Sequence, residues 1–169
     1  RMPRRDGGIA LAHFLSKNGR ILGEATVTRI SGEYFYLLSA ASAELRDLDH
    51  LVQRVEAGEQ AEIRNTTEER GVVVLAGPKA RDVLSGLTDA SLENADFPWR
   101  TAQQIEIAGI PTLALRINYV GELGWELHPA MADLRALYLA VCSAGEEHGI
   151  ADFGLYAMNS LRMEKGYRG

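Results

Sequence analysis

Pairs of short β-rich runs joined by glycine-containing turns are the feature that most constrains the fold of this 169-residue chain. Residues 20–30 and 33–39 flank Ser31-Gly32, which predicts a β-hairpin. A second hairpin is predicted about residues 109–111, between the apolar runs 105–107 and 113–119. Hairpins force neighbouring strands to run antiparallel, so the sheets of this protein are expected to be antiparallel.

The remaining apolar runs divide between strand-like and helix-like spacing. We expect further strands at 8–15, 61–65, 71–75 and 125–128, and helices at 41–57, 78–84, 131–148 and 154–165. The strand at 71–75 is expected to be buried on both faces, because Val-Val-Val-Leu is unbroken. This order predicts an α+β fold with antiparallel sheets and helices packed on one side. A strand-strand-helix-strand rhythm that occurs roughly twice favours an internal duplication.

Two details of these elements can be compared directly with a structure. In the helix at 41–57, Ser42 is the expected N-cap, and the expected buried face is Leu45, Leu48, Leu51, Val52 and Val55. In the helix at 131–148, the expected inward residues are Leu134, Leu137, Tyr138, Val141 and Cys142. Residues 66–70 and 89–100 are candidate joints, although neither is convincing as a domain boundary.

Charge and cysteine content exclude several classes of protein. The net charge of -5 argues against a nucleic-acid partner, since phosphates are met by clustered lysine and arginine. The single cysteine, Cys142, allows no intramolecular disulfide and suits a reducing compartment. No apolar run approaches the roughly 20 residues of a membrane-spanning helix. We expect a soluble, intracellular protein without a membrane or nucleic-acid partner.

The usual catalytic signatures are missing, and attention falls on residues 118–127. The four histidines, His13, His50, His128 and His148, have no metal-ligand spacing, so no metal site is expected. Within 118–127, strand alternation turns Glu126 to the face opposite Trp125 and Leu127. That face is either solvent or a binding surface, and alternation alone does not choose between them. Glu122, at the turn, is expected to be solvated.

Two stretches resemble a known family. Residues 119–127, Tyr-Val-Gly-Glu-Leu-Gly-Trp-Glu-Leu, resemble the Tyr-x-Gly-Glu-x-Gly-aromatic-Glu motif of the glycine-cleavage T-protein (aminomethyltransferase) family. Residues 156–165, Tyr-Ala-Met-Asn-Ser-Leu-Arg-Met-Glu-Lys, are similar to the dimethylglycine and sarcosine dehydrogenase branch. The resemblance implies that residues 1–169 are a truncated T-protein-like folate-binding module. An FAD domain would lie upstream and a further C-terminal domain would be absent.

The resemblance also implies roles for individual residues. Glu126 matches the glutamate that grips the pterin ring, and Tyr119 matches a tyrosine lining the folate cavity. Glu24 occupies the place of an acidic residue near the folate nitrogens that receive the carbon. Thr26 and Leu38 fall at neighbouring cavity positions.

Three positions depart from the T-protein pattern. The family commonly has aspartate where this chain has Glu24, so the reach of the acid differs by one methylene. Met158 replaces an arginine of the last helix, and Ala40 replaces an asparagine after the hairpin. The last two losses suit the dehydrogenase branch better than a free-standing T-protein.

The implied activity is formation of 5,10-methylenetetrahydrofolate from an amine-derived iminium or formaldehyde. Tetrahydrofolate would be the cofactor of this module, and FAD the cofactor of the full-length enzyme. The implied partners are folate, a small methylated amine and the upstream flavin domain. The implied location is the bacterial cytoplasm or the mitochondrial matrix, and the fragment alone would bind folate weakly and self-associate through exposed apolar surface.

Two other interpretations remain open at this stage. One is a catalytically inactive homologue that serves as a regulatory or scaffolding subunit. The other is a folate-dependent demethylase of another methylated substrate, such as a sulfonium. The identity of the methylated substrate is not encoded in these residues.

Overall fold

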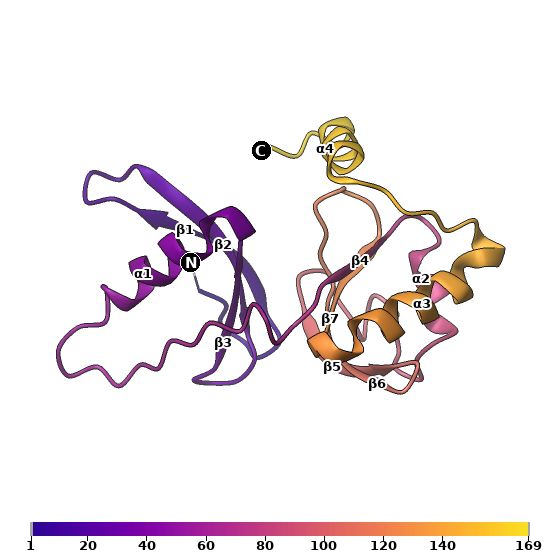
Figure 1. The fold of residues 1–169 in the computed structure, drawn as a ribbon, viewed down its shortest axis with the longest axis horizontal. Helices are drawn as coiled ribbons and strands as arrows, with labels where there is room; N and C mark the ends of the chain where they lie inside the picture. Colours follow the sequence, from indigo (N-terminus) through magenta and orange to yellow (C-terminus); the bar gives the residue numbers. More distant parts are fainter. Residues whose placement is uncertain (1, 169) are drawn as a thin grey trace. The chain divides into compact units, whose positions relative to one another are not determined.

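The computed structural model describes residues 2–168 and divides into two compact units, Arg1–Thr66 and Thr67–Gly169 (Figure 1). The boundary lies at the start of the predicted joint 66–70. Each unit has its own antiparallel sheet, with three strands in the first and four in the second. The predicted α+β class with antiparallel sheets is therefore confirmed. Within residues 2–168, no helix has both the length and the apolar character to cross a bilayer.

The first unit is a three-stranded sheet of order β1-β2-β3 with one helix. Its elements are β1 (Ile9–Leu15), β2 (Ile21–Arg29), β3 (Phe35–Ser39), the 3-10 turn η1 (Ala41–Ala43) and α1 (Glu44–Val52). The predicted hairpin is confirmed, because β2 and β3 pair antiparallel on either side of the Ser31-Gly32 turn. Backbone hydrogen bonds between Ser31 and Tyr34 close that turn.

Helix α1 differs from its prediction in length, cap and buried face. It starts at Glu44, after η1, and stops at Val52, so Ser42 is not its N-cap and Val55 lies outside it. Its buried residue is Asp47, whereas Leu45 is 72% exposed. The physical reason lies on β2, where Gly23 leaves room for the Arg46–Asp47 ion pair of 2.8 Å. A Cβ on Gly23 would lie 2.8 Å from Arg46 Nη2.

The second unit is a four-stranded sheet of order β4-β7-β6-β5. Its elements are β4 (Val73–Ala76), α2 (Ala80–Ser85), β5 (Ala102–Ile107), β6 (Ile110–Leu115), β7 (Gly124–Pro129), η2 (Met131–Asp133), α3 (Leu134–Gly145), η3 (Glu146–His148) and α4 (Leu155–Glu164). The predicted strand at 61–65 is wrong, since these residues have no regular structure. The prediction of two-sided burial at 71–75 is also wrong, because β4 is an edge strand and Val72 is exposed. The two sheets differ in strand number and order, so the element order does not repeat as an internal duplication predicts.

The second hairpin lies one to two residues earlier than predicted. Ile107 pairs with Ile110, so the turn is Ala108-Gly109 and not 109–111. Both turn residues have positive φ, 52° for Ala108 and 75° for Gly109. This conformation gives a tight two-residue turn whose twist matches that of the strands. Pro111 therefore belongs to β6, and residues 116–119 form a loop instead of a strand.

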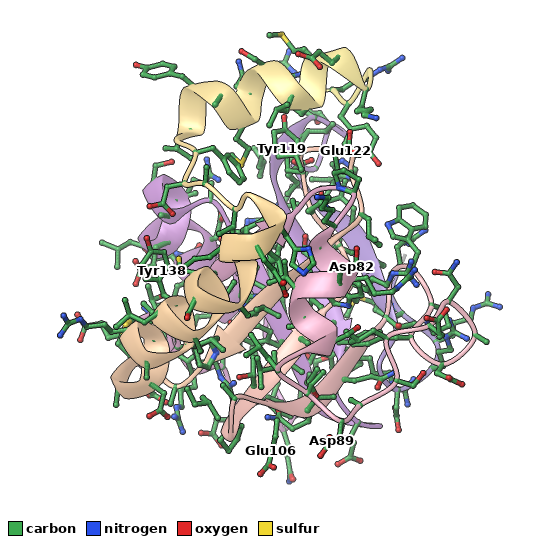
Figure 2. All side chains as sticks on the ribbon, turned by 90° about the vertical axis from the view of Figure 1, so that its right-hand side faces the viewer. Asp82, Asp89, Glu106, Tyr119, Glu122 and Tyr138 are labelled. Atoms are coloured by element: carbon green, nitrogen blue, oxygen red, sulfur yellow. The ribbon has the colours of Figure 1, made fainter. Side chains whose placement is uncertain are left out.

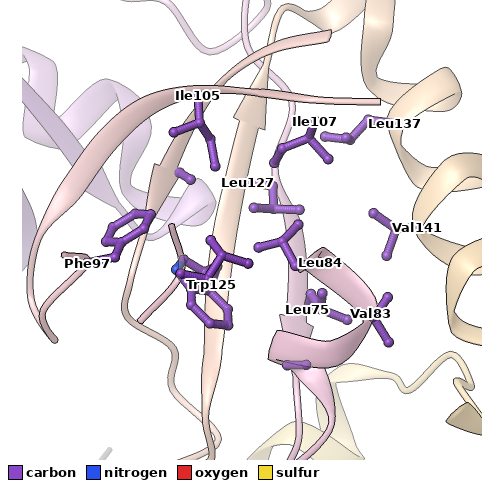
Figure 3. Close-up of a cluster of buried hydrophobic side chains, with 13 residues drawn as sticks. Leu75, Val83, Leu84, Phe97, Ile105, Ile107, Trp125, Leu127, Leu137 and Val141 are labelled. Atoms are coloured by element: carbon purple, nitrogen blue, oxygen red, sulfur yellow. The ribbon is translucent and has the colours of Figure 1, made fainter. Parts of the chain in front are cut away.

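The core of the second unit lies between one face of the sheet and helices α2 and α3 (Figure 3). Trp125 is completely buried on β7, and its ring meets that of Phe97 edge-on at 6.1 Å. On α3, Leu137 and Val141 are buried as predicted, whereas Tyr138 is 37% exposed and donates to Asp152 at 2.8 Å. That hydrogen bond is the main reason that the pKa of Tyr138 rises to about 12. Helices α2 and α3 thus pack on one face of this sheet, whereas α4 buries no residue.

Arg116 fastens the irregular segment 89–100 to the sheet. Its guanidinium donates to the Phe97 carbonyl and, at 2.6 Å, to Asn94 Oδ1, and lies 5.7 Å from the Trp125 ring centre. Burial and the neighbouring Arg81 lower the pKa of Arg116, while Glu93 opposes the shift. Arginine nevertheless stays charged at any ordinary pH. The segment without regular structure is thus held by side-chain bonds from a buried cation.

We expect Arg116→Met to lower the free energy of unfolding of the second unit by about 2 kcal/mol, because hydrogen bonds from a charged group are lost while the Phe97 carbonyl stays buried. Urea unfolding followed by near-ultraviolet circular dichroism measures this. Arg135→Met, at an exposed position of α3, is the matched control and should leave the midpoint unchanged. Equal midpoints for the two variants would contradict the anchoring role.

Candidate functional site

The predicted site residues of the first unit share one face of its sheet. Thr26 lies directly opposite Leu38 on β3, and Glu24 is two residues away on the same face of β2. Glu24 also lies opposite His13 of β1, with His13 Nε2 3.5 Å from Glu24 Oε2. The Glu24 side chain is 61% exposed. The structure therefore brings Glu24, Thr26 and Leu38 together on an accessible surface.

The other face of this sheet carries the packing of the first unit. Ala25 and Val27 are buried there, and Gly23 lies against α1. Alternation along β2 thus separates a packed face from the face that presents Glu24. The sequence does not identify His13 as a neighbour of Glu24, because the register between β1 and β2 sets this pairing and no motif marks it.

In the second unit, Glu126 lies on β7 with a core residue on either side. Trp125 and Leu127 are completely buried in the core, and Glu126 projects from the opposite face. Its neighbours across the ladder are Val74 on β4 and Leu115 on β6, which are both apolar. The Glu126 side chain is only 21% exposed. A carboxylate in such a place needs polar partners, since burying it without them is costly.

His128 lies beside Glu126 on the same face of β7 and is completely buried. Its Nε2 is 3.6 Å from Glu126 Oε2. The sequence held a signal for this pair, because residues two apart in a strand share a face. Metal-ligand spacing, the usual signal of a functional histidine, does not mark His128.

The loop between β6 and β7 carries the first half of the 119–127 motif. Asn118 fixes the loop: its side-chain amide donates to the Glu122 carbonyl at 2.7 Å, and its Oδ1 accepts from the Gly121 amide at 3.0 Å. The Glu122 side chain is 36% exposed, and it also pairs with Lys165 at 2.8 Å, a contact that the sequence did not predict. The hydrogen bond and charge of Glu122 raise the pKa of Lys165. Figure 2 shows Tyr119 and Glu122 beneath the last helix, α4.

Tyr119 is 37% exposed and is held by the end of the chain. Its hydroxyl donates to the Arg168 carbonyl at 3.2 Å, and the Arg162 guanidinium lies 5.8 Å from the ring centre. Gly121 permits this approach, because its φ is 77° and a Cβ there would lie 2.6 Å from the Lys165 side chain. The loop and α4 therefore form one packed corner of the second unit.

An open cavity of about 570 Å³ lies elsewhere in the second unit. Residues that follow α2 and residues of the β5–β6 hairpin line it, Asp89 and Glu106 among them. Figure 2 places Asp89 and Glu106 at the opposite end of this unit from Tyr119 and Glu122. The cavity is thus separate from the motif. Among residues 2–168, no group of three or more histidine, cysteine or acidic side chains could hold a metal ion.

Sequence comparison decides the family. The profile of the GCVT N-terminal domain matches residues 1–169. The chain belongs to this family. Its members include relatives far longer than the chain itself: dimethylglycine dehydrogenase of Homo sapiens is 43% identical over 94% of this chain but only 18% of that protein. Sarcosine dehydrogenase of Mus musculus is 32% identical over 98% of this chain and 20% of its own length.

A solved structure supports the fold. The crystal structure of the glycine cleavage system aminomethyltransferase T from Bartonella henselae matches with a TM-score of 0.79 and 25% identity. The match covers 97% of this GCVT-domain chain and 42% of that protein. The T-protein-like fold is thereby confirmed. The chain spans less than half the length of all three relatives, and about a fifth of the two dehydrogenases.

Gly124, the second glycine of the motif, lies where the backbone of β4 leaves no room for a side chain. A Cβ on Gly124 would collide with the Leu75 carbonyl oxygen and lie 2.9 Å from Ala76 Cα, both backbone atoms of β4. Gly124→Ala should therefore displace the β4–β7 pairing that orients Glu126 and lower the free energy of unfolding by about 1–3 kcal/mol.

Gly86→Ala is the matched control for this substitution. Its nearest neighbour to a new Cβ is the Val83 carbonyl oxygen at 3.6 Å, so no displacement is expected. Thermal unfolding and the amide spectra of β4 and β7 report the two effects. Unchanged stability and spectra in Gly124→Ala would show that the strands can adjust freely.

Proposed function

We propose that this GCVT-domain chain binds reduced folate and serves as the one-carbon acceptor module of an enzyme acting on a methylated amine. The observation that carries the proposal is Glu126, a largely buried carboxylate with apolar neighbours on both adjacent strands. It has unused acceptor capacity facing outward from the sheet. A ligand that offers two parallel N–H donors would satisfy it.

The pterin ring of folate has such an edge, formed by its 2-amino group and the adjacent ring N–H. A carboxylate accepts two parallel hydrogen bonds in one plane. Such a pair fixes the orientation of the pterin ring and also strengthens its binding. Tyr119 offers an aromatic face and a hydroxyl at the start of the same motif. Its ring is already oriented by Arg162 and the Arg168 carbonyl.

Folate supplies two nitrogens that bind the carbon of formaldehyde or an iminium, with loss of water or amine, to give 5,10-methylenetetrahydrofolate. The task of the chain is to position the ligand and to move one proton. We assign that proton to Glu24, the acid on the accessible face of β2, with Thr26 and Leu38 forming the adjacent surface. His13, at 3.5 Å, is placed to keep the Glu24 carboxylate oriented.

We further propose that residues 1–169 act as one folate-binding module of a longer protein with a flavin domain upstream. The names and lengths of the dehydrogenase relatives support this, since the chain matches about a fifth of each. The sequence carries no GxGxxG fingerprint, so the flavin is assigned to another part of the protein. Oxidation of the methylated amine would take place there.

Glu126→Gln should weaken binding of tetrahydrofolate to the full-length protein roughly tenfold to a hundredfold, because a charge-assisted hydrogen bond is lost. Isothermal titration calorimetry measures the affinity. Glu106→Gln, an exposed glutamate of the same sheet, is the control and should bind as the parent does. If Glu126→Gln also binds as the parent does, Glu126 is not the anchor.

Glu24→Gln should separate the two halves of the reaction in the full-length protein. Amine oxidation should proceed nearly unchanged, while methylenetetrahydrofolate formation slows about 10²–10⁴-fold, the usual range for a positioned acid–base group. Formaldehyde should then escape. Flavin reduction and folate product are followed in parallel, with Glu33→Gln in the β2–β3 turn as the control.

The exposure of Glu24 favours one competing function, a homologue that binds folate without transferring carbon. A 61%-exposed carboxylate is well solvated, and an acid–base group works best when partly desolvated. The same experiment distinguishes the two. If folate binds but the parent protein forms no methylenetetrahydrofolate while the flavin is reduced, the chain is a binding module only. If the parent forms product and Glu24→Gln does not slow it, Glu24 is not the acid–base group.

A further inference from the structure

We propose that His128 is the positioning residue for Glu126: it donates from Nε2 to Glu126 Oε2 and fixes the carboxylate plane for the donor edge of the ligand. This inference rests on the proposed function of the same site. It adds a specific residue and a specific atom to it.

The first support is the scarcity of other partners. Among residues 2–168, His128 is the one charged or hydrogen-bonding side chain that the structure places against the Glu126 carboxylate. The cross-strand neighbours of Glu126 are Val74 and Leu115, which offer no donor. The neighbour of His128 on β6 is Leu113, which is also apolar. Glu126 therefore has apolar neighbours on both adjacent strands and His128 beside it on its own strand.

The second support is geometry. Glu126 and His128 both belong to β7, whose pairing on two sides holds its backbone fixed. The separation of 3.6 Å between Nε2 and Oε2 is slightly longer than a hydrogen bond, and a small rotation of the carboxylate closes it. Such contacts are commonly long without ligand and shorten when it binds.

The third support is the acceptor capacity of a carboxylate. Its two oxygens have about four lone-pair sites, so Oε2 can accept from His128 and still accept from a ligand. Because His128 is completely buried, its imidazole cannot swing into solvent. An imidazole held in this way restricts the rotation of the Glu126 side chain before the ligand binds. Less conformational entropy is then lost on binding, so the affinity for the ligand is higher.

The binding test uses a double-mutant cycle on the full-length protein with tetrahydrofolate as the probe. His128→Leu should weaken binding about tenfold, and His128→Gln, which keeps a donor at a similar reach, should restore it to within about threefold of the parent. In a Glu126→Gln background, His128→Leu should lower the affinity by a further factor of less than about two. The carboxylate that His128 positions is already absent from that variant. His148→Leu, which removes another histidine beside a glutamate (3.7 Å from Glu147), is the control and should bind normally.

A second measurement does not depend on folate at all. Nitrogen-15 shifts of the His128 imidazole should show a hydrogen on Nε2, and Glu126→Gln should move that signal. An Nε2 without hydrogen would overturn the proposal, because it cannot donate. Equal losses from His128→Leu in both backgrounds, or no rescue by His128→Gln, would also overturn it and reduce His128 to a packing residue.

The two proposals fail in different ways. If the parent protein binds no tetrahydrofolate, the proposed function fails whatever the imidazole signal shows. If the parent binds, and Glu126→Gln weakens binding while His128→Leu does not, the function stands and the positioning role is wrong. The predicted pattern requires binding, coupling and rescue together.

Discussion

Strand β7 is the constraint on which the second unit depends. It pairs with β4 on one side and β6 on the other, and its side chains alternate between two opposite tasks. Trp125 and Leu127 face the helices and form the centre of the core, while Glu126 and His128 face the other way. Any shift of one residue in register would exchange these faces and put the carboxylate in the core. The packing that stabilises the unit therefore also fixes the orientation of its candidate ligand-binding group.

The rest of the second unit can be understood as support for that strand. Arg116 stacks on Trp125 and holds the irregular segment that closes the edge of the core. Gly124 lets β4 approach so closely that a methyl group would not fit. Asn118 shapes the loop that precedes β7, and the Glu122–Lys165 pair attaches that loop to α4. The positions of the two motif glycines are thus each explained by sterics, at two different contacts.

The first unit applies the same division of faces in a simpler form. One face of its sheet packs on α1 through Gly23 and the buried Asp47, and the other presents Glu24, Thr26 and Leu38. The Glu24 carboxylate is far more exposed than that of Glu126, so the two acids lie in different solvent environments.

Local chemistry in the sequence determined the hairpins, most strands and helices, the face of Glu126 and the family motif. These depend on alternation, turn residues and short-range spacing, which neighbouring residues specify by themselves. Tertiary structure decided the rest. The sequence could not show that α1 packs through Asp47, because that depends on the space above Gly23. Nor could it show that β4 lies at an edge, that His13 faces Glu24, or that Glu122 is held by Lys165. Each of these depends on which distant segment lies alongside, and long-range pairing is a property of the whole folded chain.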